Sequence, residues 1–159
     1  MSYTNADGLT ILTNGAAGVA AGNGVSAGSI KQYIVWDIAD ATAIGTSADT
    51  PDANDAFIPA NAVITNAWLV VDDAFTSGGS ATLSLGLYQQ DGTTIDADGI
   101  DATIAVATLA ADAVVPADGA LADGTQNVGA NDAYIGALYA TAAFTAGSGK
   151  LVVEYISVL

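Results

Sequence analysis

The sequence predicts an all-β protein folded as an antiparallel β-sandwich. Apolar and polar residues alternate with period two along several segments, which is typical of strands with one face in a core. Turn-forming residues separate these segments. The length of 159 residues suits one domain with a single core. We expect the sandwich to occupy residues 30–159 and an extended N-terminal arm to occupy residues 1–29.

The arm is predicted from its composition. Residues 14–29 read NGAAGVAAGNGVSAGS and hold almost no side chain large enough to anchor a core. Ahead of them, GLTILT is expected to form one short strand. The alternative interpretation is a disordered tail. Because the arm lacks large apolar residues, we expect it to be ordered by contact with a neighbouring subunit or with a larger assembly.

The body of the chain contains the segments with the strongest strand pattern. They cover residues 30–38, 63–71, 82–88 and 150–156. In the first of them, Ile34 and Ile38 share one parity while Lys31 and Asp37 share the other. Trp36 and Trp68 each lie in an apolar strand, and we interpret both as core residues.

One phrase occurs twice in the chain. AFTSGGSATLSLGLY at residues 74–88 returns as AFTAGSGKLVVEYI at residues 143–156. In each copy a phenylalanine, Phe75 or Phe144, precedes a glycine-rich stretch that resembles a turn. The repeat predicts two β-hairpins that are related in space, with the last strand inside the sheet.

The segment between the two phrases predicts one short helix in a crossover. It reads DATIAVATLAADAVVP, residues 101–116. Asp101 is a suitable N-cap, Ile100 and Ile104 share a helical face, and Pro116 ends the segment. A strand is the alternative, because an alanine- and valine-rich run of this length fits both.

The charge of the chain excludes several classes of partner. Seventeen carboxylates stand against Lys31 and Lys150 alone, a formal charge of −15. Such a surface repels nucleic acid and anionic membranes, so we expect neither as a partner. No run of about 20 apolar residues predicts a membrane span. The simplest explanation of the acidity is that the carboxylates keep an apolar-rich chain in solution.

The missing residue types argue against catalysis. The chain has no histidine and no cysteine, so it lacks the usual general base, nucleophile and zinc ligands. Paired aspartates could serve a glycosidase, but the only glutamate is Glu154 and no tryptophan cluster suggests a sugar cleft. We therefore expect no enzymatic activity and no cofactor.

Two acidic loops are weak candidates for calcium. Calcium prefers closely spaced carboxylates and turn carbonyls. The candidate ligands are Asp96, Asp98 and Asp101 in DGTTIDADGID, which also holds Asp91, and the second loop, DTPDAND, holds Asp49, Asp52 and Asp55. Neither loop completes a known calcium pattern, and solvated aspartate-rich turns are far commoner. We therefore predict no specific metal.

Three stretches carry a resemblance to a known group of proteins. They are MSYTNADGLTILT, FIPANAVITNAWLVVDDAFTSGGSATLSLGLYQQDGTTIDADGIDATIA and AAFTAGSGKLVVEYI. They resemble small virion structural proteins of tailed bacteriophages, particularly marine and cyanobacterial ones. The resemblance implies a β-sandwich subunit, often jelly-roll-like, that commonly decorates or cements a capsid. It implies no functional residues.

The predicted function is that of a non-enzymatic virion structural protein. We expect a capsid decoration or cement protein on the capsid exterior, made in the host cytoplasm. Its partners are then the major capsid protein or other virion proteins and copies of itself, with a trimer implied by the resemblance. The alternative is a head-fibre or tail-associated receptor-binding module that touches host glycans. A host surface-layer or adhesin domain would need an export signal, which MSYTNADG does not resemble.

Overall fold

The computed structural model describes residues 2–4, 10–12, 31–48, 50–51 and 55–157. By its internal contacts the chain divides into two units, Met1–Ile30 and Lys31–Leu159. In the first unit, β1 (Ser2–Thr4) pairs antiparallel with β2 (Thr10–Leu12). The short strand predicted within GLTILT is therefore present, and its partner lies within the same unit.

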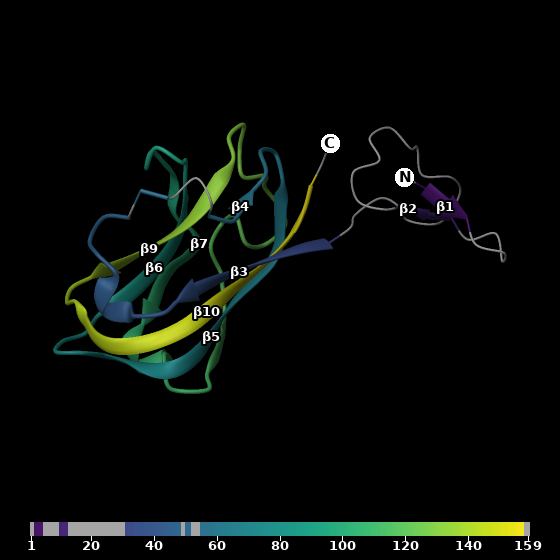
Figure 1. Ribbon diagram of the computed structural model, residues 1–159. Coiled ribbons are helices and arrows are strands. Elements are labelled where there is room, and N and C mark those ends of the chain that lie inside the picture. Colours follow the sequence, from purple (N-terminus) through teal and green to yellow (C-terminus); the bar gives the residue numbers. More distant parts are fainter. Residues whose placement is uncertain (1, 5–9, 13–30, 49, 52–54, 158–159) are drawn as a thin grey trace. The chain divides into compact units, whose positions relative to one another are not determined.

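The second unit consists of two four-stranded antiparallel sheets (Figure 1). The first sheet has the order β3 (Lys31–Ile38), β10 (Phe144–Ile156), β5 (Val63–Ser77) and β8 (Val114–Pro116). The second has the order β4 (Phe57–Ile58), β9 (Ala133–Ala140), β6 (Thr82–Tyr88) and β7 (Thr94–Ala105). The predicted all-β sandwich is confirmed. In the described part of the chain no helix is long and apolar enough to cross a membrane.

The strands pair in a nested series. β3 pairs with β10, β4 with β9, β5 with β8 and β6 with β7. The chain is thus one long antiparallel hairpin whose successive strand pairs alternate between the two sheets. This is the eight-stranded jelly roll, which the resemblance implied. β10 lies inside the first sheet, between β3 and β5, as predicted.

The core lies between the two sheets and follows the period-two pattern. On β6, Leu83, Leu85 and Leu87 are fully buried, and on β10 the matching residues are Leu151 and Val153. Their neighbours along each strand point to the opposite face. All of the buried core residues of the described chain lie between Ile34 and Tyr155.

The two repeated phrases are not hairpins, and this prediction is wrong. β5 and β6 belong to different sheets, as do β9 and β10, so the chain crosses between sheets near each phrase. The glycines of the second phrase lie inside β10, where a Cβ on Gly147 would stand 2.6 Å from Cγ of Phe75. Gly147 therefore allows close approach of an aromatic ring, and Gly149 allows close approach of the Val70 backbone. The predicted spatial relation is confirmed, because Phe144 pairs with Ser77 near the beginnings of the two phrases.

The helix predicted over residues 101–116 is wrong. Residues up to Ala105 continue β7, a 3-10 helix, η2 (Val106–Thr108), follows, and β8 begins at Val114. The other described helix is η1 (Ala41–Ala43), also a single 3-10 turn.

The buried isoleucines of β7 explain why the sequence resembled a helix. Ile100 and Ile104 both lie in the core. Two residues four positions apart share a face in a strand as well as in a helix, so their spacing fits both structures. A β-bulge also interrupts the alternation here: Leu83 of β6 faces Ile104 and Leu85 faces Asp101, so three steps along β7 match two along β6.

Candidate interaction surface

One face of the first sheet packs against the core, and the opposite face points away from it. This opposite face is the candidate functional site. Three cross-strand rows run over it, as fixed by the strand register. We call this surface the outer face and define it by Lys31, Tyr33, Val35, Asp37, Asn66, Trp68, Val70, Asp72, Val114, Pro116, Lys150, Val152 and Glu154.

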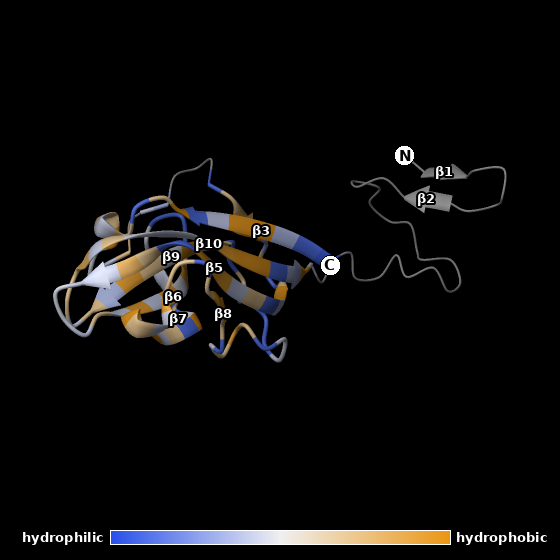
Figure 2. Cartoon of the chain, turned by 90° about the horizontal axis from the view of Figure 1, so that it is seen from below, coloured by the Kyte–Doolittle hydropathy of each residue, from blue (hydrophilic) through white to orange (hydrophobic). Residues whose placement is uncertain are grey.

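The middle of the outer face is apolar across all four strands. Its central row consists of Val35, Val152, Trp68 and Pro116, one residue from each of β3, β10, β5 and β8. Val35 is 57% exposed, and Val114 in the next row is 62% exposed. Along β3 the hydrophobic residues concentrate in the middle of the strand (Figure 2). Apolar surface that spans a whole sheet commonly marks a contact with another molecule.

Trp68 lies on the outer face and not in the core, where the sequence analysis had placed it. Ala67 and Leu69 on either side of it are fully buried in the core, so alternation directs Trp68 to the outer face. Trp36 alternates along β3 with the outer-face residues Val35 and Asp37, so it is directed to the other side of the sheet and packs against the core, as expected. The prediction that both tryptophans are core residues therefore holds for Trp36 and is wrong for Trp68.

Both cations of the chain lie on the outer face. Lys31 Nζ lies 2.6 Å from Oε1 of Glu154, and Lys150 forms an ion pair with Asp72. Two lysines against Asp37, Asp72 and Glu154 leave this face a net charge of −1, whereas the whole chain carries −15. The outer face is thus close to neutral on a strongly acidic protein.

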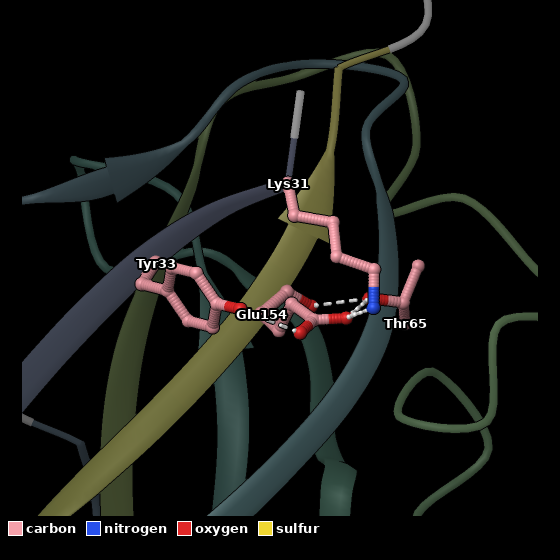
Figure 3. Close-up of polar contacts among 4 residues, drawn as sticks. All are labelled: Lys31, Tyr33, Thr65 and Glu154. Carbon is pink, nitrogen blue, oxygen red and sulfur yellow. Dashed lines mark hydrogen bonds and ion pairs between the residues drawn. The ribbon is translucent and has the colours of Figure 1, made fainter. Parts of the chain in front are cut away.

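Glu154 is the polar centre of one end of the outer face, where three side chains converge on it (Figure 3). Tyr33 donates its hydroxyl to Oε2 at 2.9 Å, Thr65 donates its hydroxyl to Oε1 at 2.5 Å, and Lys31 supplies the positive charge. The side chain of Glu154 is only 9% exposed. Lys31 first, and the two hydroxyls with it, hold the pKa of Glu154 at about 2, below its ordinary value of 4.5.

We expect this cluster to give the protein an acid-sensitive part of its stability. A carboxylate with a depressed pKa stabilises the folded state fully above its unfolded pKa of about 4.5, and this contribution is lost as the pH falls through about 2. Urea unfolding of the wild type and of Glu154→Gln, measured from neutral pH down to pH of about 2, checks this.

The two unfolding curves isolate Glu154, because every other carboxylate is common to both proteins. The stability advantage of the wild type over Glu154→Gln should shrink between pH of about 4.5 and about 2. An advantage that stays constant across that window would show that the Lys31 pair does not hold the pKa of Glu154 down.

The three calcium candidates do not form one cluster. The Asp96 carboxylate accepts a hydrogen bond from the backbone N–H of Asp98 at 3.4 Å, and the Asp101 carboxylate accepts one from the N–H of Thr103 at 3.0 Å. Burial raises the pKa of Asp96, with Asp98 adding to the rise, and burial also raises the pKa of Asp101. Within the described ranges no group of three or more acidic side chains could hold a metal ion.

The second acidic loop is described only in part. Asp49 and Asp52 lie outside the described residues, and Asp55 lines a half-open pocket of about 360 Å³. Trp36, Ile135, Asp37 and Asp40 are among the residues that line this pocket. Asp91 of the first loop accepts the N–H of Thr93 at 2.9 Å, a local turn bond.

The comparisons with known proteins bear on the fold. No protein-family model and no curated protein matches the chain. Among solved structures, the chain is similar to a chain of the capsid of Ralstonia phage GP4, with a TM-score of 0.51 and 23% sequence identity. The match covers 81% of this chain and 85% of that one. At this identity the likeness concerns the fold.

Proposed function

We propose that the chain is a non-enzymatic structural protein of a bacteriophage particle, acting as a capsid decoration or cement protein on the outside of the head. The observation that carries the proposal is the jelly roll shared over 81% of the chain with a protein of a phage capsid. The composition supports it, because histidine and cysteine are absent from the sequence. The outer face supplies a surface suited to protein contact and not to chemistry.

The proposed partners are the major capsid protein or other virion proteins, together with copies of the chain itself. The charge of −15 speaks against nucleic acid and anionic membranes as partners. The trimeric state and a marine or cyanobacterial phage source remain predictions from the resemblance.

Binding to purified heads tests the proposed function. The full-length protein should co-sediment with heads of the phage that encodes it, in a saturable manner, and should raise the temperature at which they rupture. Heads that lack the protein serve as the starting material, and isolated tails serve as the comparison. Recovery with tails, or with neither particle, overturns the decoration role.

We predict that deletion of residues 1–29 leaves the sandwich folded and weakens attachment to heads. The fold is expected to survive because the core residues lie between Ile34 and Tyr155. Attachment is expected to weaken because the glycine- and alanine-rich segment has little to bury except against a neighbour. Circular dichroism and urea unfolding report the fold, and co-sedimentation reports attachment. A truncated protein that does not fold would place the arm in the core.

The pocket supports one alternative function, that of a glycan-binding module in a head fibre or tail. Its lining residues include Trp36, an aromatic residue, and Ser47, Thr50 and Asp55, whose polar side chains are of the kind that binds sugar hydroxyls. A protein that ignores heads, binds glycans of the host surface and loses that binding on Trp36→Ala would favour this alternative.

A further inference from the structure

We infer that the outer face of the first sheet is a self-association surface, which packs against the same face of a second copy of the chain. This inference deepens the proposed function, from which it takes the expectation that subunits associate. It adds the surface involved and the symmetry of the contact. A surface that meets its own copy is related to it by a twofold axis, so the product is a closed pair and not the trimer that the resemblance implied.

The charge distribution favours a second copy at the outer face. Two chains of −15 repel each other, so two copies meet most easily where carboxylates are compensated. The outer face is such a place, because both lysines of the chain lie there and each is paired with a carboxylate. A basic partner would have no reason to prefer this face, since uncompensated carboxylates lie elsewhere on the chain.

The apolar row provides the attraction. Trp68 and Val152 lie in the middle of the face, on the two interior strands of the sheet, and Val35 and Pro116 flank them on the edge strands. A half-buried tryptophan at the centre of an apolar patch is the residue type that dominates the energy of protein contacts. The ion pairs lie in the neighbouring rows, because Lys150 and Glu154 flank Val152 along β10 and border the apolar row on either side.

The area of the outer face limits the expected strength of the dimer. Four strands spaced about 4.8 Å apart and rows about 7 Å apart give a flat area of a few hundred Å². Stable complexes bury roughly 800 Å² on each partner. We therefore expect a weak pair whose population depends on concentration.

Analytical ultracentrifugation of the full-length protein over a wide concentration range tests the inference. The wild type should form dimers, and Trp68→Lys should weaken dimerisation by at least about tenfold, since a lysine would meet its own symmetry mate in an apolar contact. Val35→Lys, at a position that is 57% exposed, should act in the same direction with little risk to the fold. A wild type that stays monomeric, or that forms trimers, overturns the face-to-face pair.

The matched control lies on the other sheet. Leu138 is a half-buried, outward-facing residue of β9, opposite Ser84 of β6, so Leu138→Lys makes the same change of charge away from the outer face. It should leave dimerisation unchanged. Equal weakening by Leu138→Lys and Trp68→Lys would show a general effect of charge and overturn the assignment of the surface.

Cysteine cross-linking gives a second, independent readout, because the chain has no native cysteine. Val152→Cys, beside Trp68 in the middle of the face, should yield covalent dimers with a short bifunctional maleimide, and Leu138→Cys should not. Dimers that form without any binding to heads support the pair and contradict the decoration role. Binding to heads by a protein that never dimerises supports the decoration role and contradicts the pair.

Discussion

Self-association of the purified protein is expected to strengthen by at least tenfold as sodium chloride rises from about 0.01 M to about 1 M. The reason is the charge of −15, which makes two approaching copies repel each other over the whole screening length. That length falls from ~30 Å to ~3 Å across this range. The apolar attraction of the outer face then acts against a much smaller repulsion. Light scattering and sedimentation at each salt concentration measure the change.

The shape of the salt dependence separates screening from other effects of salt. Most of the gain should appear below about 0.15 M, where the screening length has already fallen to ~8 Å. Sodium thiocyanate at the same low ionic strength should act like the chloride, because screening depends on charge and not on the identity of the anion. Association that weakens with salt, as it does for a basic nucleic-acid binder, would contradict the charge argument.

Truncation of either aromatic residue of the repeated phrases should be the most damaging single change to stability. Phe75 and Phe144 are 4% and 3% exposed, and their rings meet edge to face with centroids 5.3 Å apart. Phe75→Ala and Phe144→Ala should each lower the free energy of unfolding by about 3–5 kcal/mol. Domains of this kind have roughly 5–15 kcal/mol in total, so each variant approaches the limit of folding. Urea unfolding measures both.

A double-mutant cycle with leucine in place of alanine keeps the proteins folded and isolates the ring contact. The coupling between Phe75→Leu and Phe144→Leu should be about 0.5–1.5 kcal/mol. Phe57→Leu is the control, because Phe57 is 42% exposed and lies on the short strand β4. Additive effects of the two core variants would mean that the rings contribute only their separate burial.

The strands that are regular in structure could be predicted from the sequence, and those with irregular register could not. β6 has the predicted bounds, residues 82–88, because its leucines alternate without interruption. β7 was mistaken for a helix because its buried Ile100 and Ile104 are four residues apart, a spacing that fits both structures, and because a bulge interrupts its alternation. The period-two alternation of a strand is visible in a sequence only where no bulge interrupts the strand.

The prediction of two hairpins was wrong for a different reason. Glycine permits both a tight turn and a close approach of two groups, and the residue letter does not distinguish them. At Gly147 the need is close approach to Phe75, a residue that lies far away in the sequence. Which sheet a strand joins is decided by contacts of that kind, so the hairpin was a natural but wrong interpretation.

A signal for the outer face was nevertheless present in the sequence. In AWLVV, residues 67–71, both parities are apolar, with Leu69 directed to the core and Trp68 and Val70 directed away from it. Strands that are apolar on both faces are typical of sheets covered on both sides. The charges could not be assigned in the same way, because the pairing of Lys31 with Glu154 depends on the strand register.

The position of β10 has a consequence for how the protein is made. β10 fills the place between β3 and β5, and it follows both of them in the chain, with Gln32 and Tyr155 in contact across 123 positions. During synthesis β3 and β5 therefore have no neighbour at their facing edges until β10 has left the ribosome. Contacts so distant in sequence are typical of slow folding. In that interval both strands expose unpaired edges, which makes the nascent chain open to pairing with other chains.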